Sequence, residues 1–383
     1  MSKGPAIDVV GYEKCVGCFA CLNACPEGAV KVLESDEGFY YPKVCENCKK
    51  CGVCQEFCPV LSSRPSGDEP KFYAGWSKSE EIRIRASSGG IFPELAKYVL
   101  ESGGIVFGVA LDEKLSAKHV KVESVKDLDK LMGSKYVQSY VDLAYREALN
   151  EAKKRLVLFS GTPCQTAALR NFEGSENVIV VDVVCHGVSS NLAFRKYLKF
   201  VEREAGKRVV GLSFRDKKSG WKDYQVAIKL EDGTEIRKHH KLDPFFRGYL
   251  LNLYLRLSCY SCPFCKIPRS SDITLGDFWG VPRKIRDRRG VSIVIVNSKR
   301  GEKILNQLLE LGRIELVEVS SKLAIRGNPR IISGEYAIPK ERGLILKTLR
   351  GSGFEEIIRY LKPKSPLFKV KLMISSLLRK VLL

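Results

Sequence analysis

Two stretches of the chain are apolar over the length of a strand, Arg155–Ser160 and Val178–Val184. Continuous apolar runs of this length are typical of strands that are buried on both faces of a sheet. Between them and the N-terminus, apolar residues recur with helical spacing over Asp142–Lys153. The pattern therefore predicts a sheet with helices packed against it.

Further elements follow from the same reading. Helices are predicted at Glu94–Glu101 and Gly301–Leu311, and strands at Gly104–Ala110 and Val291–Val296. The stretch Gln225–His239, with Asp232 and Gly233 at its centre, predicts a β-hairpin. The predicted fold class is α+β or α/β, with a mixed sheet flanked by helices.

The two ends of the chain differ from this middle part. Short strands are predicted at Ala29–Leu33 and Gly38–Pro42, and the polar stretch Leu61–Pro70, rich in Pro and Gly, reads as a linker. We therefore expect a small N-terminal domain at 1–62, a larger domain at 71–335 and a helical extension at 336–383.

The end of the extension predicts a basic amphipathic helix that starts near Ser365. Its apolar face consists of Leu367, Val370, Ile374, Leu377, Leu378 and Val381. Such a helix fits an anionic membrane surface, and it equally fits a helix packed on the protein's own core or on a partner subunit.

Composition narrows the class of protein. The chain has 383 residues, 44% of them hydrophobic, and no run of 18 apolar residues, so a membrane-spanning helix is not expected. No signal peptide is recognised, and the predicted location is the cytoplasm, with peripheral membrane contact through residues 365–383 as the alternative. The net charge of +20 indicates an anionic partner, but the basic residues lack the interleaved aromatics of nucleic-acid binders, so nucleic acid is not expected.

The strongest chemical signal is a pair of cysteine runs, each with the spacing C-x2-C-x2-C-x3-C-P. This spacing holds two 4Fe–4S clusters, because the fourth cysteine of each run crosses over to the other cluster. We expect Cys15, Cys18, Cys21 and Cys58 to bind one cluster, named cluster I here. We expect Cys25, Cys48, Cys51 and Cys54 to bind the other, named cluster II.

Two other uses of these cysteines fit less well. Disulfides need an oxidising compartment, and structural zinc sites usually show two C-x2-C pairs rather than triplets with a distal Cys-Pro. Cys45 lies three residues before Cys48 and is interpreted as a bystander, with a substitute ligand as the alternative.

A second set of cysteines lies downstream. Cys164 and Cys185 each follow a predicted buried strand, and Cys259, Cys262 and Cys265 are spaced two residues apart. Two strand-end cysteines and a C-x2-C pair could close a third four-cysteine site. The start of a helix after Cys164 favours its thiolate. The alternatives are a catalytic pair of Cys164 with His186 and buried structural thiols.

With these residues, the chain resembles the family of coenzyme F420 hydrogenase/dehydrogenase beta subunits up to about Arg330. The resemblance rests on the cysteine runs and on the ordered segments Ala86–Ile91, Gly133–Ser139, Ser160–Gln165, Cys185–Gly187, Phe214–Lys217 with Gly220-Trp221, Cys259–Cys262 and Ser271–Trp279. In layout the chain is most similar to the electron-input subunits of membrane-linked F420 dehydrogenases.

The resemblance implies one FAD beside a third 4Fe–4S cluster. It implies Cys164, Cys185, Cys259 and Cys262 as ligands of that cluster, with Cys265 as an extra or substitute cysteine. It implies FAD contacts at Ser87, Ser88, Gly89, Gly90, Gly133, Ser134 and Lys135. Consecutive Gly and Ser residues suit this role, because they offer close backbone approach and N–H donors to a pyrophosphate.

The function that follows is an oxidoreductase that passes electrons between reduced coenzyme F420 and a partner protein or membrane acceptor through FAD and 4Fe–4S clusters. No catalytic side chain is expected, because the flavin carries the hydride chemistry. Two alternatives remain open, a reductase of another organic substrate, as in the chlorophyll and polysaccharide branches of the family, and a non-enzymatic electron-relay subunit.

Secondary roles are expected for several other side chains. Arg215, Lys217, Lys218, Arg283 and Lys284 are candidate contacts for the anionic tail of the deazaflavin, with solvated basic loops as the default. His186 is expected to support the third cluster, whereas His119, His239 and His240 are expected at the surface. Trp221 and Trp279 are expected in the core, with stacking near the flavin as the alternative.

Overall fold

The computed structural model of the chain describes residues 4–64 and 68–361. The predicted amphipathic helix from Ser365 onward lies outside the described residues, as does the centre of the predicted linker.

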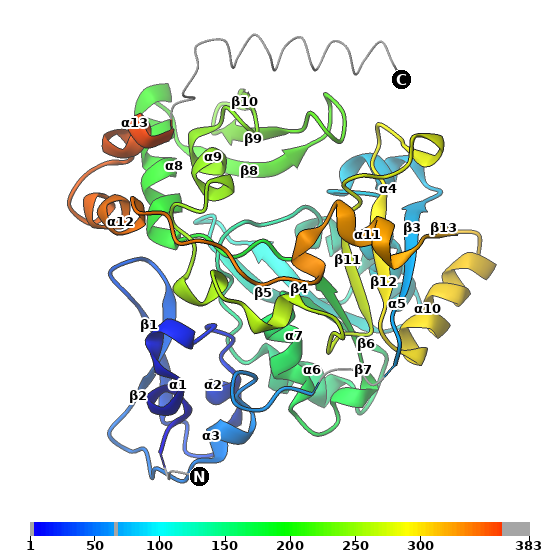
Figure 1. Ribbon diagram of the computed structural model, residues 1–383, viewed down its shortest axis with the longest axis horizontal. Coiled ribbons are helices and arrows are strands. Elements are labelled where there is room, and N and C mark those ends of the chain that lie inside the picture. The colour runs from blue at the N-terminus through cyan, green and yellow to red at the C-terminus, as the bar shows by residue number, and fades with distance from the viewer. Residues whose placement is uncertain (1–3, 65–67, 362–383) are drawn as a thin grey trace.

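The largest element is an eight-stranded mixed sheet in the order β13-β3-β12-β11-β7-β6-β4-β5 (Figure 1). Strands β4, β6, β7 and β11 run parallel, and the pairs on either side of them are antiparallel. The strands are β3 (Lys71–Ser77), β4 (Ile105–Leu111), β5 (Ala117–Val122), β6 (Val157–Gly161), β7 (Val178–Val183), β11 (Ile273–Asp277), β12 (Ser292–Val296) and β13 (Ile314–Glu318).

Helices cover both faces of this sheet, which explains the continuous apolar runs. Alternate residues of β6 and β7 point to opposite faces, because side chains alternate along a strand. One face packs against α5 (Ile91–Glu101) and α10 (Lys299–Glu310), and the other against α6 (Ala144–Glu151) and α7 (Pro163–Arg170). The predicted strands and helices of the middle part are confirmed, with bounds that differ by one to three residues.

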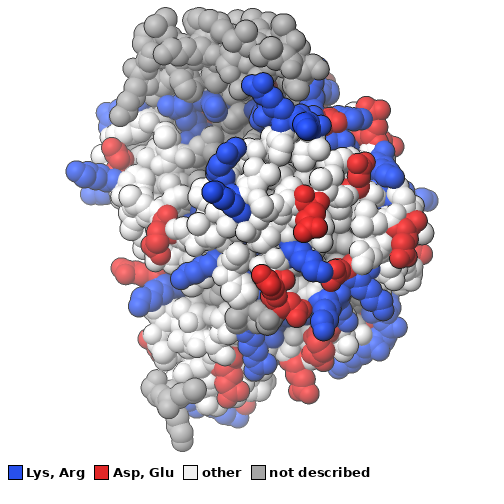
Figure 2. Space-filling model, turned by 45° about the vertical axis from the view of Figure 1, so that its right-hand side comes forward, with Lys and Arg blue, Asp and Glu red and all other residues white. Residues whose placement is uncertain are grey.

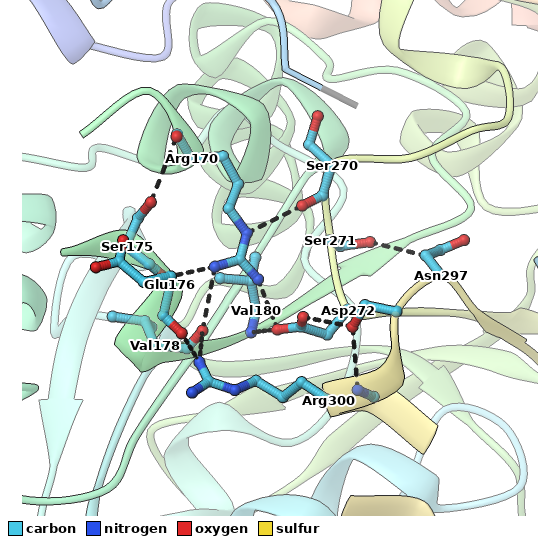
Figure 3. A network of polar contacts seen from close by, with 12 residues as sticks. Arg170, Ser175, Glu176, Val178, Val180, Ser270, Ser271, Asp272, Asn297 and Arg300 are labelled. Carbon is cyan, nitrogen blue, oxygen red and sulfur yellow. Dashed lines mark hydrogen bonds and ion pairs between the residues drawn. The ribbon is translucent and has the colours of Figure 1, made fainter. Parts of the chain in front are cut away.

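The amino-terminal ends of β7 and β11 are held by a buried ionic network. Asp272 accepts hydrogen bonds from the backbone N–H of Val180 at 2.7 Å and from Ser298 Oγ at 2.7 Å, and it pairs with Arg170 at 2.6 Å. Arg170 also donates to the Ser270 carbonyl at 3.0 Å. Figure 3 shows Arg170 and Val180 beside Asp272, with Ser270 bonded to Arg170, so this edge of the sheet is fixed by charges that satisfy one another.

The N-terminal module lies against one end of the sheet domain (Figure 1). It contains α1 (Ala6–Lys14), α2 (Ala20–Ala24), β1 (Val30–Glu34), β2 (Tyr40–Val44) and α3 (Val53–Glu56). Strands β1 and β2 pair antiparallel, which confirms the two predicted short strands. Residues Val16, Phe19 and Ala20 share a core with α6 and α7, so the module and the sheet domain pack as one body.

The chain that follows β7 forms a separate three-stranded sheet, in the order β10-β9-β8, with helices packed against it. It comprises α8 (Asn191–Ala205), β8 (Val209–Asp216), β9 (Gln225–Leu230), β10 (Glu235–His239) and α9 (Pro244–Leu250). The predicted hairpin is β9 with β10. The C-terminal helices α12 (Arg342–Gly351) and α13 (Ile358–Leu361) pack into the same core. The remaining helices are α4 (Glu80–Arg85) and α11 (Ser321–Arg326).

Two histidines lie where the sequence reading did not place them. His119 is 8% exposed and stacks on Phe159 with 5.2 Å between ring centroids, and His240 is 5% exposed. The expectation that these two lie at the surface is wrong. His119 follows Ala117 by two positions on β5, so both point inward while Lys118 points to solvent.

Positive and negative side chains are mixed on the face of the molecule that Figure 2 shows. Figure 2 shows Lys and Arg interspersed with Asp and Glu on this face, so the positive excess forms no single continuous patch there. Within residues 4–64 and 68–361, no helix has both the length and the apolar character needed to cross a membrane.

Candidate electron-transfer site

The cysteines predicted to bind cluster I lie together in the module. Burial raises the pKa of Cys18, and the neighbouring thiols of Cys58, Cys21 and Cys15 raise it further. Thiols affect one another's pKa in this way only at short range. Cys58, which is distant in sequence, therefore lies beside the first cysteine run in space. Cluster II shows the same crossover, because burial raises the pKa of Cys54 and the nearby Cys25 and Cys51 add to it.

The downstream cysteines are brought together by the sheet. Cys164 is at the start of α7, directly after β6, and Cys185 follows β7. These strands are parallel neighbours, so both thiols lie at the same carboxyl-terminal edge. Cys259 and Cys262 reach that edge from the 3₁₀ turns η3 (Leu257–Cys259) and η4 (Pro263–Cys265), and all four cysteines line one cavity. We call this cavity the embedded site.

Burial favours the protonated form of three thiols of the embedded site, those of Cys164, Cys185 and Cys259. Burial, followed by the charges of Cys259 and Cys262, raises the pKa of Cys185 to about 12. Burial also raises the pKa of Cys164 well above its ordinary value. The expectation that the start of α7 favours a Cys164 thiolate is therefore wrong, because desolvation outweighs the helix terminus here. Binding of metal would release these protons.

The donor set fits a four-thiolate cluster. Within the described residues, no three side chains of Cys, His, Asp or Glu converge on one point as ligands of a single ion do. A cubane needs no such convergence, since each thiolate binds its own iron. The hydroxyl of Ser258 lines the cavity, is buried, and has no hydrogen-bond partner in the described chain. An unpaired buried donor beside four thiols suits a sulfide acceptor.

Arg330 supplies a buried positive charge to the embedded site. Its Nε donates to the Cys185 carbonyl at 3.2 Å and its Nη2 to the Cys259 carbonyl at 3.3 Å. The sequence reading missed Arg330 and Ser258. Ser258 adjoins a cysteine and could have been noticed, whereas Arg330 is far from every cysteine in sequence.

Two further side chains surround these ligands. Cys265 is fully buried, and its hydrogen bond to Cys262 lowers the pKa of Cys262. The Cys265 thiol also donates to the Cys185 carbonyl at 3.6 Å. His186 lies between Asn252 Oδ1 at 2.7 Å and Tyr336 Oη at 2.9 Å. It therefore faces a polar pair rather than Cys164, which leaves the alternative of a catalytic cysteine–histidine pair without geometric support.

The embedded site borders the N-terminal module. Val16 and Gly17 line the cavity, and Cys18 is among the thiols that raise the pKa of Cys164. Tyr145, buried between the two groups, donates to the Cys18 carbonyl at 2.9 Å. The cluster I cysteines are therefore the immediate neighbours of the embedded site.

The two predicted flavin segments meet. The backbone N–H and the hydroxyl of Ser134 contact Ser87 Oγ at 2.9 and 3.0 Å. Gly89 is held against the sheet, since its N–H donates to Ser292 Oγ at 2.9 Å and an added Cβ would lie 2.3 Å from the Gly75 carbonyl. Gly90 has φ +89° and begins α5, which only glycine adopts easily.

One short segment joins this loop pair to the embedded site. It runs from Gly133 to Ser139, and Ser139 accepts a hydrogen bond from Gln165 at 2.9 Å beside Cys164. The five residue steps from Ser134 to Ser139 span at most about 18 Å at full extension. Within the segment, half-buried Lys135 donates to the Lys130 and Met132 carbonyls at 3.1 and 3.0 Å, and burial lowers its pKa to about 7.

Two of the predicted tail contacts are wrong. Arg215 is buried and forms a two-pronged ion pair with Asp277 at 2.6 and 2.8 Å. Lys217 is buried and donates to the Arg83, Ser88 and Arg289 carbonyls at 2.5–2.7 Å. The charged groups of both side chains are therefore bonded to partners inside the protein. Lys218, Arg283 and Lys284 are exposed, and their role stays a prediction.

The tryptophans form a core pair. Trp221 is 1% exposed and stacks on Trp279 with 5.1 Å between ring centroids, and its Nε1 donates to Asp277 at 2.5 Å. The core role predicted for Trp221 is confirmed.

Comparison with known families accounts for most of the chain. Residues 72–144 match the model described as "Coenzyme F420 hydrogenase/dehydrogenase, beta subunit N-term", and residues 154–322 match the corresponding C-terminus. Residues 14–61 match a 4Fe-4S dicluster domain.

Two curated relatives share about a quarter of their aligned residues with this chain. A subunit of the F(420)H(2) dehydrogenase of Methanosarcina mazei is 26% identical over 46% of this chain, and the match spans 55% of that relative's length. The beta subunit of the coenzyme F420 hydrogenase of Methanococcus voltae is 23% identical over 66% of this chain and 85% of its own. A solved chain, titled "Xenon derivatization of the F420-reducing [NiFe] hydrogenase complex from Methanosarcina barkeri", has 20% identity and a TM-score of 0.47 over 68% of this chain and 89% of its own.

Proposed function

Because the chain belongs to the family of coenzyme F420 hydrogenase/dehydrogenase beta subunits and carries a 4Fe–4S dicluster domain, we propose that it passes electrons between reduced coenzyme F420 and a partner protein. In this proposal FAD binds at Ser87–Gly90 and Gly133–Lys135. A third 4Fe–4S cluster binds at the embedded site, and clusters I and II complete the path to the partner.

The proposal rests mainly on the segment Gly133–Ser139. One end of it contacts Ser87, and the other end contacts Gln165 in the wall of the embedded site. A flavin held by the first contact and a cluster held beside the second are therefore separated by no more than the length of this segment. The embedded site in turn borders Cys18 of cluster I.

The chain's residues position and shield the carriers. Flavin supplies the conversion between a two-electron hydride and single electrons, which a deazaflavin and a 4Fe–4S cluster cannot exchange directly. Ser134 and Ser87 offer N–H and hydroxyl groups to a pyrophosphate, while Gly89 lets the backbone approach it. The surroundings of Cys164, Cys185 and Cys259 desolvate these thiols and raise their pKa values, so a cluster bound there would be shielded from bulk solvent.

The partner is proposed to dock beside cluster II. Of the fourteen cysteines, all of them described, Cys51 alone is exposed, so this group reaches the surface most closely. The predicted partner is a subunit of a redox complex, and contact with a membrane through residues 365–383 stays a prediction.

The test is an anaerobic count of iron and flavin followed by addition of reduced F420. The proposal expects one FAD and about twelve irons, four for each of three cubane sites, with rapid bleaching of the flavin band. A count of about eight irons would mean that the embedded site holds no cluster. Bound FAD that F420 leaves oxidised, but that reduced ferredoxin bleaches, would indicate another organic substrate. Absence of flavin after reconstitution would leave a relay subunit.

A further inference from the structure

Arg256 is a buried cation without an acidic partner. Its side chain is 0% exposed, and no carboxylate pairs with it among the described residues. Its neighbours are carbonyls, an amide and the ring of Tyr41, which lies 3.9 Å from the guanidinium carbon. Its Nη2 has no hydrogen-bond partner in the described chain. A buried charge of this kind is costly unless an anion compensates it.

The position of Arg256 suggests which anions those are. Its Nε donates to the carbonyl of Cys15, a predicted ligand of cluster I, at 2.8 Å. Its own carbonyl accepts a hydrogen bond at 2.9 Å from the N–H of Cys259, a predicted ligand of the embedded site. One residue therefore joins the ligand loops of two predicted clusters, each of which is anionic when four thiolates bind it.

The surrounding contacts hold Arg256 in place. Its backbone N–H donates to the Val188 carbonyl at 3.1 Å, in the wall of the embedded site. Its Nη1 donates to the Tyr40 carbonyl at 2.9 Å and to Gln138 at 3.3 Å. Gly17, with φ +63°, has space for no side chain, because a Cβ would lie 3.0 Å from the guanidinium and 2.4 Å from Gln138.

We propose that Arg256 is a positioning residue that fixes the embedded cluster against cluster I and raises the reduction potential of both with its charge. The proposal rests on the proposed function, because it requires the embedded site to hold a cluster. A positive charge beside a cluster stabilises the reduced form, which carries one more negative charge. A rigid tie between the ligand loops keeps the distance between the clusters constant.

The test compares three variants of the complete chain, reduced by dithionite so that F420 is not required. Arg256→Gln removes the charge and the donor fork, Arg256→Lys keeps the charge, and Arg342→Gln is the matched control. Arg342 is also buried and also ties the module to the sheet domain, through Glu37 at 2.8 Å and the Leu255 carbonyl at 3.1 Å, but it contacts no predicted ligand.

The readouts are iron content, midpoint potentials and the magnetic interaction between reduced clusters in electron paramagnetic resonance spectra. With about twelve irons retained, Arg256→Gln is expected to shift at least one of the two midpoints to a more negative potential. The equilibrium constant for reduction of that cluster is expected to fall about tenfold, which is the size expected for the loss of one charged hydrogen bond. Arg256→Lys is expected to keep most of this potential but to change the magnetic interaction, whereas Arg342→Gln leaves both at wild-type values.

Contrary results are separable from failure of the proposed function. If wild type holds twelve irons and F420 bleaches its flavin, but Arg256→Gln and Arg342→Gln behave alike, the role of Arg256 is purely structural and this inference is overturned. If both Arg256 variants lose iron while Arg342→Gln keeps it, the positioning role stands. If F420 fails but the potentials shift as expected, the inference stands and the substrate assignment falls.

Discussion

The N-terminal module and the sheet domain gather cysteines in opposite ways. In the module, eight predicted ligands lie between Cys15 and Cys58, separated by two or three residues within each run. In the sheet domain, Cys164, Cys185 and the Cys259–Cys262 pair come from separate segments, and the parallel strands β6 and β7 bring the first two together. A local pattern specifies the first kind of site, whereas the fold specifies the second.

The same contrast applies to stability. The module contains three short helices and one two-stranded sheet, and some of its buried apolar residues, Val16, Phe19 and Ala20 among them, belong to a core shared with α6 and α7. The sheet domain has its own cores on both faces of the sheet and a buried ionic network at Asp272. In small metal-binding domains the energy of metal binding usually contributes to folding, whereas the sheet domain has large cores that need no metal.

Removal of iron gives the sharpest test of this contrast. After anaerobic chelation we expect the amides of residues 4–62 to lose most of their protection against hydrogen exchange, because metal-binding energy is folding energy in such modules. The amides of β4, β6 and β7 should stay protected. Mass spectrometry of exchanged peptides measures both regions at once. Reconstitution with iron and sulfide is the control, and retained protection of the module in the metal-free protein would disprove the contrast.

The second prediction concerns the sheet domain alone. Asp272→Ala leaves Arg170 buried without its partner and should lower the free energy of unfolding by about 3–5 kcal/mol. Chemical denaturation of the sheet domain measures this loss. Iron per folded molecule should not change, because the network lies at the opposite edge from the cysteines.

The control for Asp272 is an exposed ion pair. Asp36, 79% exposed at its side chain, pairs with Arg350 at 3.0 Å, so Asp36→Ala should hardly change stability. Equal effects of the two substitutions would mean that burial does not decide the strength of these pairs.

The sequence could predict those features that depend on local pattern. The runs of β6 and β7 and the hairpin β9–β10 are periodic signals, and the structure agrees with them. Both cysteine runs are spaced signals, and the match of residues 14–61 to a 4Fe-4S dicluster domain supports them. Predicting that Cys164 and Cys185 meet required only the rule that parallel strands end at one edge.

The features that sequence reasoning missed depend on tertiary contacts. Arg256 and Arg330 resemble any other basic residue until the fold buries them beside the predicted ligands. In the sequence Arg215 and Lys217 look like surface cations, but they are buried by contacts with Asp277 and with the Ser88 carbonyl. The helix terminus beside Cys164 predicts a lowered pKa, although burial raises it.

The third prediction probes the junction of the two regions. Gly17→Ala should destabilise the protein by about 2–4 kcal/mol, the sum of a left-handed backbone and a clash with Gln138 and Arg256. Both of those side chains are held by hydrogen bonds, so they cannot move aside freely. Gly28→Ala is the matched control, since Gly28 has φ +60° but an added Cβ would meet nothing within 4 Å. It should cost only about 1 kcal/mol, and thermal unfolding of both variants isolates the packing contribution.

The last prediction uses acid to separate the regions. The four histidines of the chain lie outside the module, and burial lowers the pKa of His119 on β5 to about 4. The unfolded chain therefore binds more protons than the folded chain between about pH 6.5 and 4, and stability falls as pH falls through that window.

Between pH 7.5 and 5.5, His119 lowers the free energy of unfolding by about 1.4 kcal/mol. This loss arises because, from about pH 6.5 down to 5.5, the unfolded chain binds one proton at this histidine that the folded chain does not bind. His119→Phe keeps a ring beside Phe159 and removes this dependence, so the difference in free energy of unfolding between variant and wild type should change by that amount over this range. Anaerobic urea denaturation at both pH values measures it. Hydrogen exchange in residues 4–62 should respond equally to pH in both proteins. If the variant instead protects the module at pH 5.5, the two regions unfold as one unit, and the contrast between them is confined to how their cysteines are assembled.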